Sequence, residues 1–274
     1  MESSINKDTR LCISLAARPG NFGTRFHNFL YRALGLDFIY KAFTTRDLAA
    51  AVGGVRALGI RGCAVSMPFK EACIEFLDAM DPSAEGIMSV NTIVNDDGWL
   101  TGYNTDYTAV RSLLQTYQVP TDLEFALRGS GGMAKAVACA LRDAGFTRGV
   151  IVARNEAAGT ALADPYGFRW QPDLTEEQPG LLVNVTPIGM AGGADADQLA
   201  FGEARVRASS VVFDVVASPP ETPLIRLATS LGKVTLTGAE VIALQAIEQF
   251  VLYTGVRPDA QLAARAAAFA RGPA

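Results

Sequence analysis

Short hydrophobic runs and segments with helical hydrophobic spacing alternate along the first 80 residues. Runs typical of strands, apolar and bounded by turn-forming residues, occur at 11–15, 37–42 and 60–65. Hydrophobic residues with helical spacing follow the first run, after a Pro- and Gly-containing loop at 16–23. A second such segment follows the second run, over 47–58. A third helix is expected from Phe69 to about Met80. Strands that alternate with helices in this way predict a parallel or mixed α/β sheet.

A hairpin is predicted in the next segment. The runs 90–94 and 99–103 flank Asn95-Asp96-Asp97-Gly98, in which Asp-Gly is a strong turn signal. A helix is expected from about Tyr107 to Tyr117, and the polar stretch at 119–122 is a candidate domain boundary.

The segment from Leu123 to Gly145 predicts a strand, a tight glycine turn and a helix. Gly129, Gly131 and Ala134 fit the spacing G-x-G-x-x-A. Such a turn brings a pyrophosphate close to the backbone and to the N–H groups at the helix N-terminus. A strand–helix connection without a ligand has the same pattern, so the spacing alone leaves both readings open.

Further strands are expected at 149–153, 181–185 and 210–216, and helices from Gly238 and over the tail. Arg154 follows the first of these strands, where an NAD-binding unit carries an acidic residue that binds the ribose hydroxyls. A guanidinium suits a 2′-phosphate, which favours NADP. Glu156 nearby keeps NAD possible, and Arg154 as a solvated surface charge is the alternative.

Composition narrows the class of protein. With 274 residues, 49% of them apolar and 19% charged, the chain predicts a globular protein of two domains or one large one. A net charge of −4 argues against nucleic-acid binding, and the polar start and short apolar runs argue against a signal peptide and a membrane span. We expect a cytoplasmic protein.

Cysteine and histidine usage limits the possible chemistry. The four cysteines have no C-x-x-C spacing, so we expect them to be reduced core residues. They are Cys12, Cys63, Cys73 and Cys139. His27 is the only histidine, which excludes a two-histidine metal site and any Ser-His triad without it. We therefore expect no metal.

Seven short motifs occur in a fixed order along nearly the whole chain. They are Val65-Ser66-Met67-Pro68-Phe69-Lys70, Val90-Asn91-Thr92, Gly102-Tyr103-Asn104-Thr105-Asp106, the glycine turn from Gly129 to Ala134, Ala153-Arg154-Asn155, Asn184-Val185-Thr186-Pro187-Ile188-Gly189-Met190 and Gln245-Ala246. In this order they resemble the motifs of the shikimate dehydrogenase family.

The resemblance implies two α/β domains with the active site in the cleft between them. A discontinuous substrate-binding domain would comprise 1–106 and 239–274, and a Rossmann-type NADP-binding domain 107–238. The implied reaction is reversible hydride transfer between NADPH and the ketone of 3-dehydroshikimate. Its substrate is a small carboxylated cyclohexene polyol, and the chain would act as a monomer or homodimer without nucleic acid or membrane.

The resemblance also assigns residues. The implied catalytic pair is Lys70 and Asp106, and the implied substrate-binding residues are Asn21, Gly23, Thr24, Ser66, Asn91 and Gln245. The implied nucleotide-binding residues are Gly129, Ser130, Gly131, Gly132, Met133, Ala134, Arg154, Asn155, Thr186, Met190, Val215 and Gly238. Without the motifs, Lys70 would read as a surface lysine, Asp106 as a helix N-cap, Asn91 as a turn residue and Gln245 as an ordinary helix residue.

The substrate side departs from the family pattern. Asn21 and Gly23 stand where the family carries the serine pair that binds the substrate carboxylate, Ala64 replaces an asparagine, and Ala217 replaces a tyrosine. Each change removes a polar partner worth roughly 1–3 kcal/mol. Quinate or aminoshikimate, with NAD or NADP, is therefore an alternative substrate. A nucleotide-binding regulator with weak or no catalysis is another alternative.

Overall fold

The computed structural model describes residues 5–175 and 177–272. It divides into two compact units. Unit 1 extends to Thr105 and resumes at Ala243, and unit 2 runs from Asp106 to Ile242. The domain boundaries expected from the sequence lie after residues 106 and 238.

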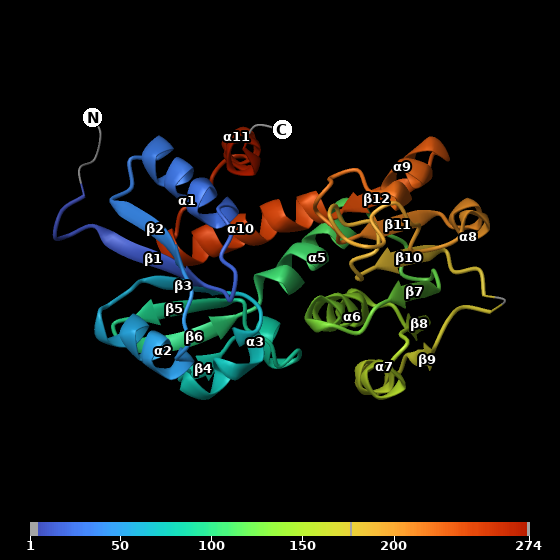
Figure 1. Ribbon diagram of the computed structural model, residues 1–274, viewed down its shortest axis with the longest axis horizontal. Helices are drawn as coiled ribbons and strands as arrows, with labels where there is room; N and C mark the ends of the chain where they lie inside the picture. Colours follow the sequence, from blue (N-terminus) through green and yellow to red (C-terminus); the bar gives the residue numbers. More distant parts are fainter. Residues whose placement is uncertain (1–4, 176, 273–274) are drawn as a thin grey trace. The chain divides into compact units, whose positions relative to one another are not determined.

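Unit 1 contains a mixed six-stranded sheet in the order β2-β1-β3-β5-β6-β4 (Figure 1). β1 pairs in parallel with β2 and β3, whereas β5 is antiparallel to both β3 and β6. The strands are β1 (Arg10–Leu15), β2 (Phe38–Phe43), β3 (Gly62–Val65), β4 (Ala79–Met80), β5 (Thr92–Asp96) and β6 (Trp99–Tyr103).

Two hydrophobic clusters hold the helices on the two faces of this sheet. One joins α1 (Phe22–Ala33) to α10 (Gly238–Thr254) and α11 (Ala260–Arg271), with Phe26, Tyr31 and Phe250 at its centre. The other joins α2 (Leu48–Ala57) to the opposite face through Val52 and Val55. Unit 1 is therefore a helix–sheet–helix sandwich, as its alternating pattern predicts.

The structure confirms the expected hairpin. The prediction of a long helix from Phe69 is wrong. Asp97 and Gly98 form the two-residue turn with φ of +51° and +94°, and Asn95 Oδ1 accepts from Gly98 N at 2.7 Å. The segment after Pro68 instead forms α3 (Phe69–Ala72), a 3₁₀ turn η1 (Ile74–Phe76) and then β4, followed by α4 (Pro82–Glu85).

Unit 2 contains six parallel strands in the order β12-β11-β10-β7-β8-β9. This is the doubly wound order of a Rossmann-type sheet, so the predicted fold class is confirmed. The strands are β7 (Phe125–Arg128), β8 (Gly149–Val152), β9 (Arg169–Gln171), β10 (Leu181–Asn184), β11 (Val211–Asp214) and β12 (Val234–Thr237).

Helices cover both faces of this second sheet (Figure 1). α6 (Gly132–Ala144) and α7 (Glu156–Ala163), which leads into the 3₁₀ turn η2 (Asp164–Tyr166), lie on one face. α8 (Glu203–Ala208) and α9 (Pro223–Ser230) pack on the other through Val206 and Leu224. α5 (Thr105–Thr116) leads into the unit. Crossovers of this kind align the carboxyl ends of the strands at one edge, where ligands bind.

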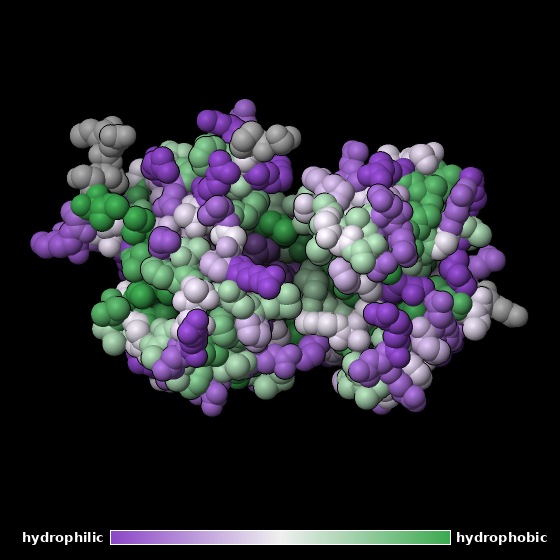
Figure 2. Space-filling view, in the orientation of Figure 1, coloured by the Kyte–Doolittle hydropathy of each residue, from purple (hydrophilic) through white to green (hydrophobic). Residues whose placement is uncertain are grey.

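The surface adds two observations. On the face drawn in Figure 2, hydrophilic side chains are scattered over each unit rather than gathered in one stripe. Within the described part of the chain, no helix has the length and apolar character needed to cross a bilayer.

Candidate functional site

The carboxyl ends of β7, β8 and β10 open onto a pocket of about 930 Å³ in unit 2. Of the residues expected to bind a nucleotide, its lining includes Gly129, Ser130, Gly131, Arg154, Asn155 and Thr186. The structure therefore brings together residues of three separate motifs at the edge of a doubly wound sheet. This is the position at which such folds bind dinucleotides.

The glycines of the turn have different roles. Gly129 has a φ of +123°, and a Cβ there would lie 2.8 Å from Val185 Cγ2 and 3.0 Å from the Val185 carbonyl oxygen. Only glycine fits this position. A Cβ at Gly131 or Gly132 would meet nothing within 4 Å, and no side chain caps the N-terminus of α6. The approach to the first turn of α6 is thus open to an anion.

Arg154 and Asn155 follow β8 directly. Arg154 is exposed and lines the pocket. Asn155 is the N-cap of α7, where its Oδ1 accepts a hydrogen bond from Ala158 N at 3.0 Å. The cap fixes the start of α7, and with it the place of Arg154 beside the pocket.

A buried polar network shapes the loop after β10. Asn184 Oδ1 accepts from Thr186 Oγ1 at 2.6 Å, and Asn184 Nδ2 donates to Asp214 Oδ1 at 2.9 Å. Thr222 Oγ1 donates to Asp214 Oδ2 at 2.6 Å. Burial raises the pKa of the Asp214 carboxyl in spite of these bonds. Thr186 is therefore held at the pocket by a network of satisfied groups.

The other expected nucleotide-binding residues lie outside this lining. Gly132, Met133 and Ala134 form the first turn of α6 behind the glycine turn. Met190 is exposed in the loop after β10. Val215 and Gly238 touch each other after β11 and β12, since a Cβ at Gly238 would lie 2.2 Å from the Val215 carbonyl oxygen.

Hydrogen bonds in unit 1 join four of the other motifs. Val90 N donates to the Lys70 carbonyl oxygen at 2.8 Å, which places Lys70 beside the segment that carries Asn91, just before β5. Asn91 Oδ1 accepts from Thr105 N at 2.8 Å, and Thr105 Oγ1 lies 3.5 Å from Gln245 Oε1. Asn91 is buried and bonded in a cluster, so it is not the simple turn residue of the alternative reading.

Lys70 and Asp106 occupy different elements. Lys70 lies in α3 of unit 1, and Asp106 is the first residue of unit 2. α5 begins at Thr105, so Asp106 lies in its first turn and is not the N-cap that the alternative reading expected. The pairing of the two side chains stays a prediction.

The start of α1 bears on the departure from the family pattern. A Cβ at Gly23 would lie 3.3 Å from the Tyr40 hydroxyl oxygen, so Tyr40 crowds this position. Asn21 precedes α1 without a side-chain cap, and Thr24 is half-buried in its first turn. Ser66 is exposed after β3.

Histidine and the cysteines are buried in the protein. His27 is fully buried and stacks on Tyr40, with ring centroids 4.5 Å apart. All four cysteines are free and buried. Within residues 5–175 and 177–272, no three His, Cys, Asp or Glu side chains are grouped as metal ligands would be.

Sequence reasoning missed several pocket residues. The lining also contains Arg128, Pro172, Asp195 and Gln198. Arg128 could have been noticed, since it is a charged residue that ends an otherwise apolar strand just before Gly129. The other three lie in irregular segments far along the chain and carry no local signal.

Comparison with known proteins decides the family. The chain is 58% identical over 267 residues to a shikimate dehydrogenase-like protein of Haemophilus influenzae, covering 97% of this chain and 98% of that protein. The chain belongs to the shikimate dehydrogenase family. The family model of the shikimate dehydrogenase substrate binding domain matches residues 22–93.

Solved structures agree with this membership. One of a shikimate 5-dehydrogenase-like protein has a TM-score of 0.96 and 57% identity, covering 98% of this chain and 100% of that chain. The shikimate 5-dehydrogenase of Thermus thermophilus, in complex with NADP(H) and shikimate, has a TM-score of 0.84 and 30% identity, covering 95% and 99%.

Proposed function

We propose that this member of the shikimate dehydrogenase family catalyses reversible hydride transfer between NADPH and the ketone of 3-dehydroshikimate, giving shikimate and NADP⁺. The pocket at the glycine turn, with Arg154 in its lining, is the observation that carries the proposal. The Thermus thermophilus relative supports it, because that enzyme was solved with NADP(H) and shikimate.

The pocket residues fit NADP. The open approach at Gly131 and the uncapped N-terminus of α6 suit the pyrophosphate. Arg154 stands at the end of β8, where the 2′-position of the adenosine ribose lies in such folds. A guanidinium favours a 2′-phosphate at this position, so we expect NADP to be preferred over NAD.

Lys70 and Asp106 are the proposed catalytic residues. Bound NADPH supplies the hydride. As negative charge develops on the carbonyl oxygen, the Lys70 ammonium stabilises it and donates a proton to it. Asp106 is proposed to hold Lys70 and to share its proton. Asn91 and Gln245 are proposed to bind substrate hydroxyls through their amide groups.

The substrate itself needs a direct test. Tyr40 crowds Gly23, and this position lacks the serine of the family pattern. Quinate or aminoshikimate therefore belongs in the test beside shikimate. The measurement is absorbance at 340 nm with each compound, in the presence of NADP and separately of NAD. Higher activity with NAD than with NADP would contradict the role given to Arg154.

The Lys70→Ala variant tests the catalytic assignment. We expect turnover to fall by roughly 10²–10⁴-fold because the proton donor is lost. The melting temperature should stay close to that of the wild type, since Lys70 lies on a short helix outside both hydrophobic clusters. Lys41→Ala is the matched control, because Lys41 is an exposed lysine of the same unit.

Two outcomes would count against the proposal. Near-normal turnover in Lys70→Ala would remove Lys70 from the mechanism. A wild-type protein that binds NADP but oxidises no compound of the panel would favour the nucleotide-binding regulator.

A further inference from the structure

Arg128 is a charged residue at the end of the otherwise apolar strand β7. It ends β7 and pairs in register with Val152 of β8 and Asn184 of β10. Its side chain lies on the same face as Ala126, two residues earlier, which belongs to the hydrophobic cluster with Phe201. Arg128 also lines the pocket.

Two contacts hold the guanidinium group. One terminal nitrogen, Nη2, lies 2.6 Å from Asp173 Oδ1. Cζ lies over the ring of Phe201, 5.2 Å from its centroid. The Nε atom is buried without a hydrogen-bond partner in the described part of the chain. Asp173 and Phe201 thus hold the guanidinium at a residue that also lines the pocket.

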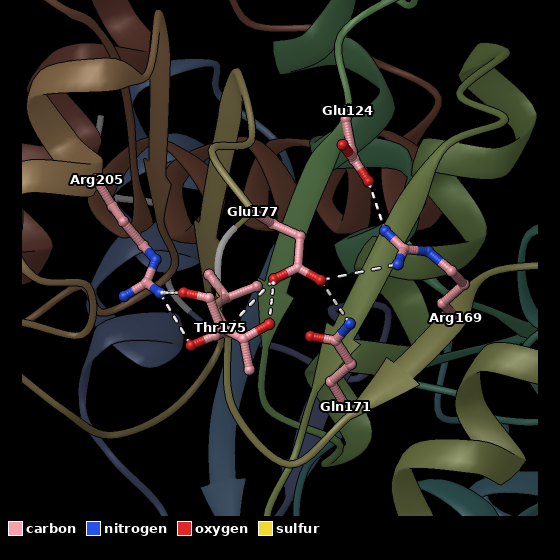
Figure 3. A network of polar contacts seen from close by, with 7 residues as sticks. Glu124, Arg169, Gln171, Thr175, Glu177 and Arg205 are labelled. Carbon is pink, nitrogen blue, oxygen red and sulfur yellow. Dashed lines mark hydrogen bonds and ion pairs between the residues drawn. The ribbon is translucent and has the colours of Figure 1, made fainter.

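A polar network holds the loop that carries Asp173 (Figure 3). Glu177 accepts from Gln171 Nε2 at 2.6 Å and from Thr175 N at 3.1 Å, and Arg205 donates to the carbonyl oxygens of Leu174 and Thr175, each at 2.9 Å. Asp173 Oδ1 also accepts from Leu174 N at 2.9 Å. The carboxylate is therefore presented to Arg128 by a loop anchored on both sides.

This arrangement favours a stacking role for Arg128 over a phosphate-binding role. The Asp173 carboxylate already neutralises its charge at 2.6 Å. The buried Nε–H is left unpaired, which carries an energetic cost. The guanidinium is flat and held in place beside the pocket, and such groups stack on aromatic rings.

The topology indicates which aromatic ring this is. In a doubly wound sheet the pyrophosphate lies at the first glycine turn and the adenosine ribose at the end of the next strand. Arg128 reaches from the end of β7 to Asp173, which follows β9, and so extends past the end of β8. Its guanidinium is therefore on the adenosine side of the pocket, with Pro172 and Arg154 in the same lining.

We propose that the guanidinium of Arg128, fixed by Asp173 and Phe201, is the platform on which the adenine ring of the nucleotide stacks. The inference rests on the proposed nucleotide binding and adds to it a specific residue for the base. Arg154 would recognise the 2′-phosphate, and Arg128 the flat face of adenine.

Two substitutions distinguish the effect of the planar guanidinium group from the effect of its charge. Arg128→Met keeps an unbranched side chain but removes both the planar group and the charge. Arg128→Lys keeps the charge but removes the planar group. Asp173 is 69% exposed, so water can solvate its carboxylate when its partner is lost. Arg142→Met is the matched control, because Arg142 pairs with Asp143 at 2.6 Å and lies 4.9 Å from the Tyr166 ring centroid, outside the pocket lining.

Calorimetric titration with 2′,5′-ADP and with NADP gives the readout. Both Arg128 variants should bind 2′,5′-ADP about tenfold more weakly than the wild type. Arg142→Met should bind within about twofold of it. Wild-type affinity in Arg128→Met would overturn the platform. Full affinity in Arg128→Lys combined with a loss in Arg128→Met would also overturn it, because charge rather than stacking would then be responsible.

The same titrations separate this inference from the proposed reaction. A wild-type protein that binds 2′,5′-ADP but transfers no hydride refutes the reaction and leaves the platform to be judged by the variants. A wild-type protein that binds neither 2′,5′-ADP nor NADP refutes both.

Discussion

At the scale of single residues, His27 gives the protein a specific dependence on pH. Its ring is fully buried among aromatic rings, and neither nitrogen has a hydrogen-bond partner among the described residues. Burial lowers the pKa of His27 to about 3. The folded protein therefore keeps His27 neutral at pH values where the unfolded chain, with a pKa of about 6.5, takes up a proton.

The sign of the effect follows from this difference. Above about pH 6.5 the folded and the unfolded state both have a neutral histidine, so His27 does not change the free energy of unfolding. As the pH falls below 6.5, the unfolded state gains a proton that the folded state does not bind, so the free energy of unfolding falls by about 1.4 kcal/mol per pH unit. Urea unfolding at pH 7 and pH 5 should therefore differ by about 2 kcal/mol through His27 alone.

The variant His27→Phe isolates this contribution. His27 is the only histidine, so no other imidazole contributes between pH 5 and 7. Carboxylates contribute equally to both proteins, and the wild type should lose about 2 kcal/mol more than the variant. Parallel pH profiles for the two proteins would contradict the buried neutral state of His27.

At the scale of the element, the two glycines of the β7–α6 turn make a matched pair. Gly129→Ala places a Cβ 2.8 Å from Val185 Cγ2 at a φ of +123°, so the turn must move. We expect a loss of stability of roughly 1–3 kcal/mol and weakened nucleotide binding. Gly131→Ala meets nothing within 4 Å, and its φ of −82° suits alanine. It should retain the wild-type stability and lose nucleotide affinity, because its Cβ enters the space for the pyrophosphate.

Thermal unfolding and titration with NADP check this pair. If Gly131→Ala binds NADP as the wild type does, the pyrophosphate does not approach this turn. If Gly129→Ala is as stable as the wild type, the close contact with Val185 is relieved at no cost.

The sequence predicts the elements whose local pattern agrees with their tertiary surroundings. The buried strands β7, β8, β10 and β11 consist mostly of apolar residues, and each was expected within one or two residues. β12 was missed because only Leu236 of its four residues is buried, and Val234 is exposed. α7, α8 and α9 were missed because they are only six to eight residues long.

The helix expected from Phe69 to Met80 shows tertiary contacts overriding local pattern. Its apolar spacing is helical, yet Leu77 is extended with φ and ψ of −96° and 154°. The carboxylate of Asp78 accepts from Leu100 N at 2.7 Å and pairs with Arg56 at 2.7 Å. These contacts draw the chain into β4 beside β6, and no pattern within 69–80 reveals them.

In the candidate site, too, some residues could be predicted from local sequence and others could not. The glycine turn and Arg154 could be identified because their chemistry is carried by neighbouring residues. The orientation of Arg128 depends on Asp173, 45 positions further along the chain, and on Phe201. A contact over such a distance leaves no periodic trace in a single sequence.

At the scale of the whole molecule, the two units differ in how the chain builds them. Unit 2 is one continuous segment, whereas unit 1 needs α10 and α11 from the end of the chain. Those helices contribute Phe250 and Ala267 to the cluster that buries Phe26 and Tyr31 of α1. Removing them would expose this face of the first sheet, and a domain that loses half of its core does not fold.

Fragments of the chain should therefore behave differently. Residues 106–242 alone should unfold cooperatively in urea and bind 2′,5′-ADP, since the sheet, both helical layers and the pocket are complete within them. Residues 1–105 alone should lack a cooperative transition. Thr105 Oγ1 lies 3.5 Å from Gln245 Oε1, so a short Gly/Ser linker can join 1–105 to 243–274. That joined fragment should regain cooperative unfolding, because the cluster around Phe26 is whole again. If 1–105 folds as well as the joined fragment, then α10 and α11 do not supply the missing core, and the first sheet is stable through its α2 face alone.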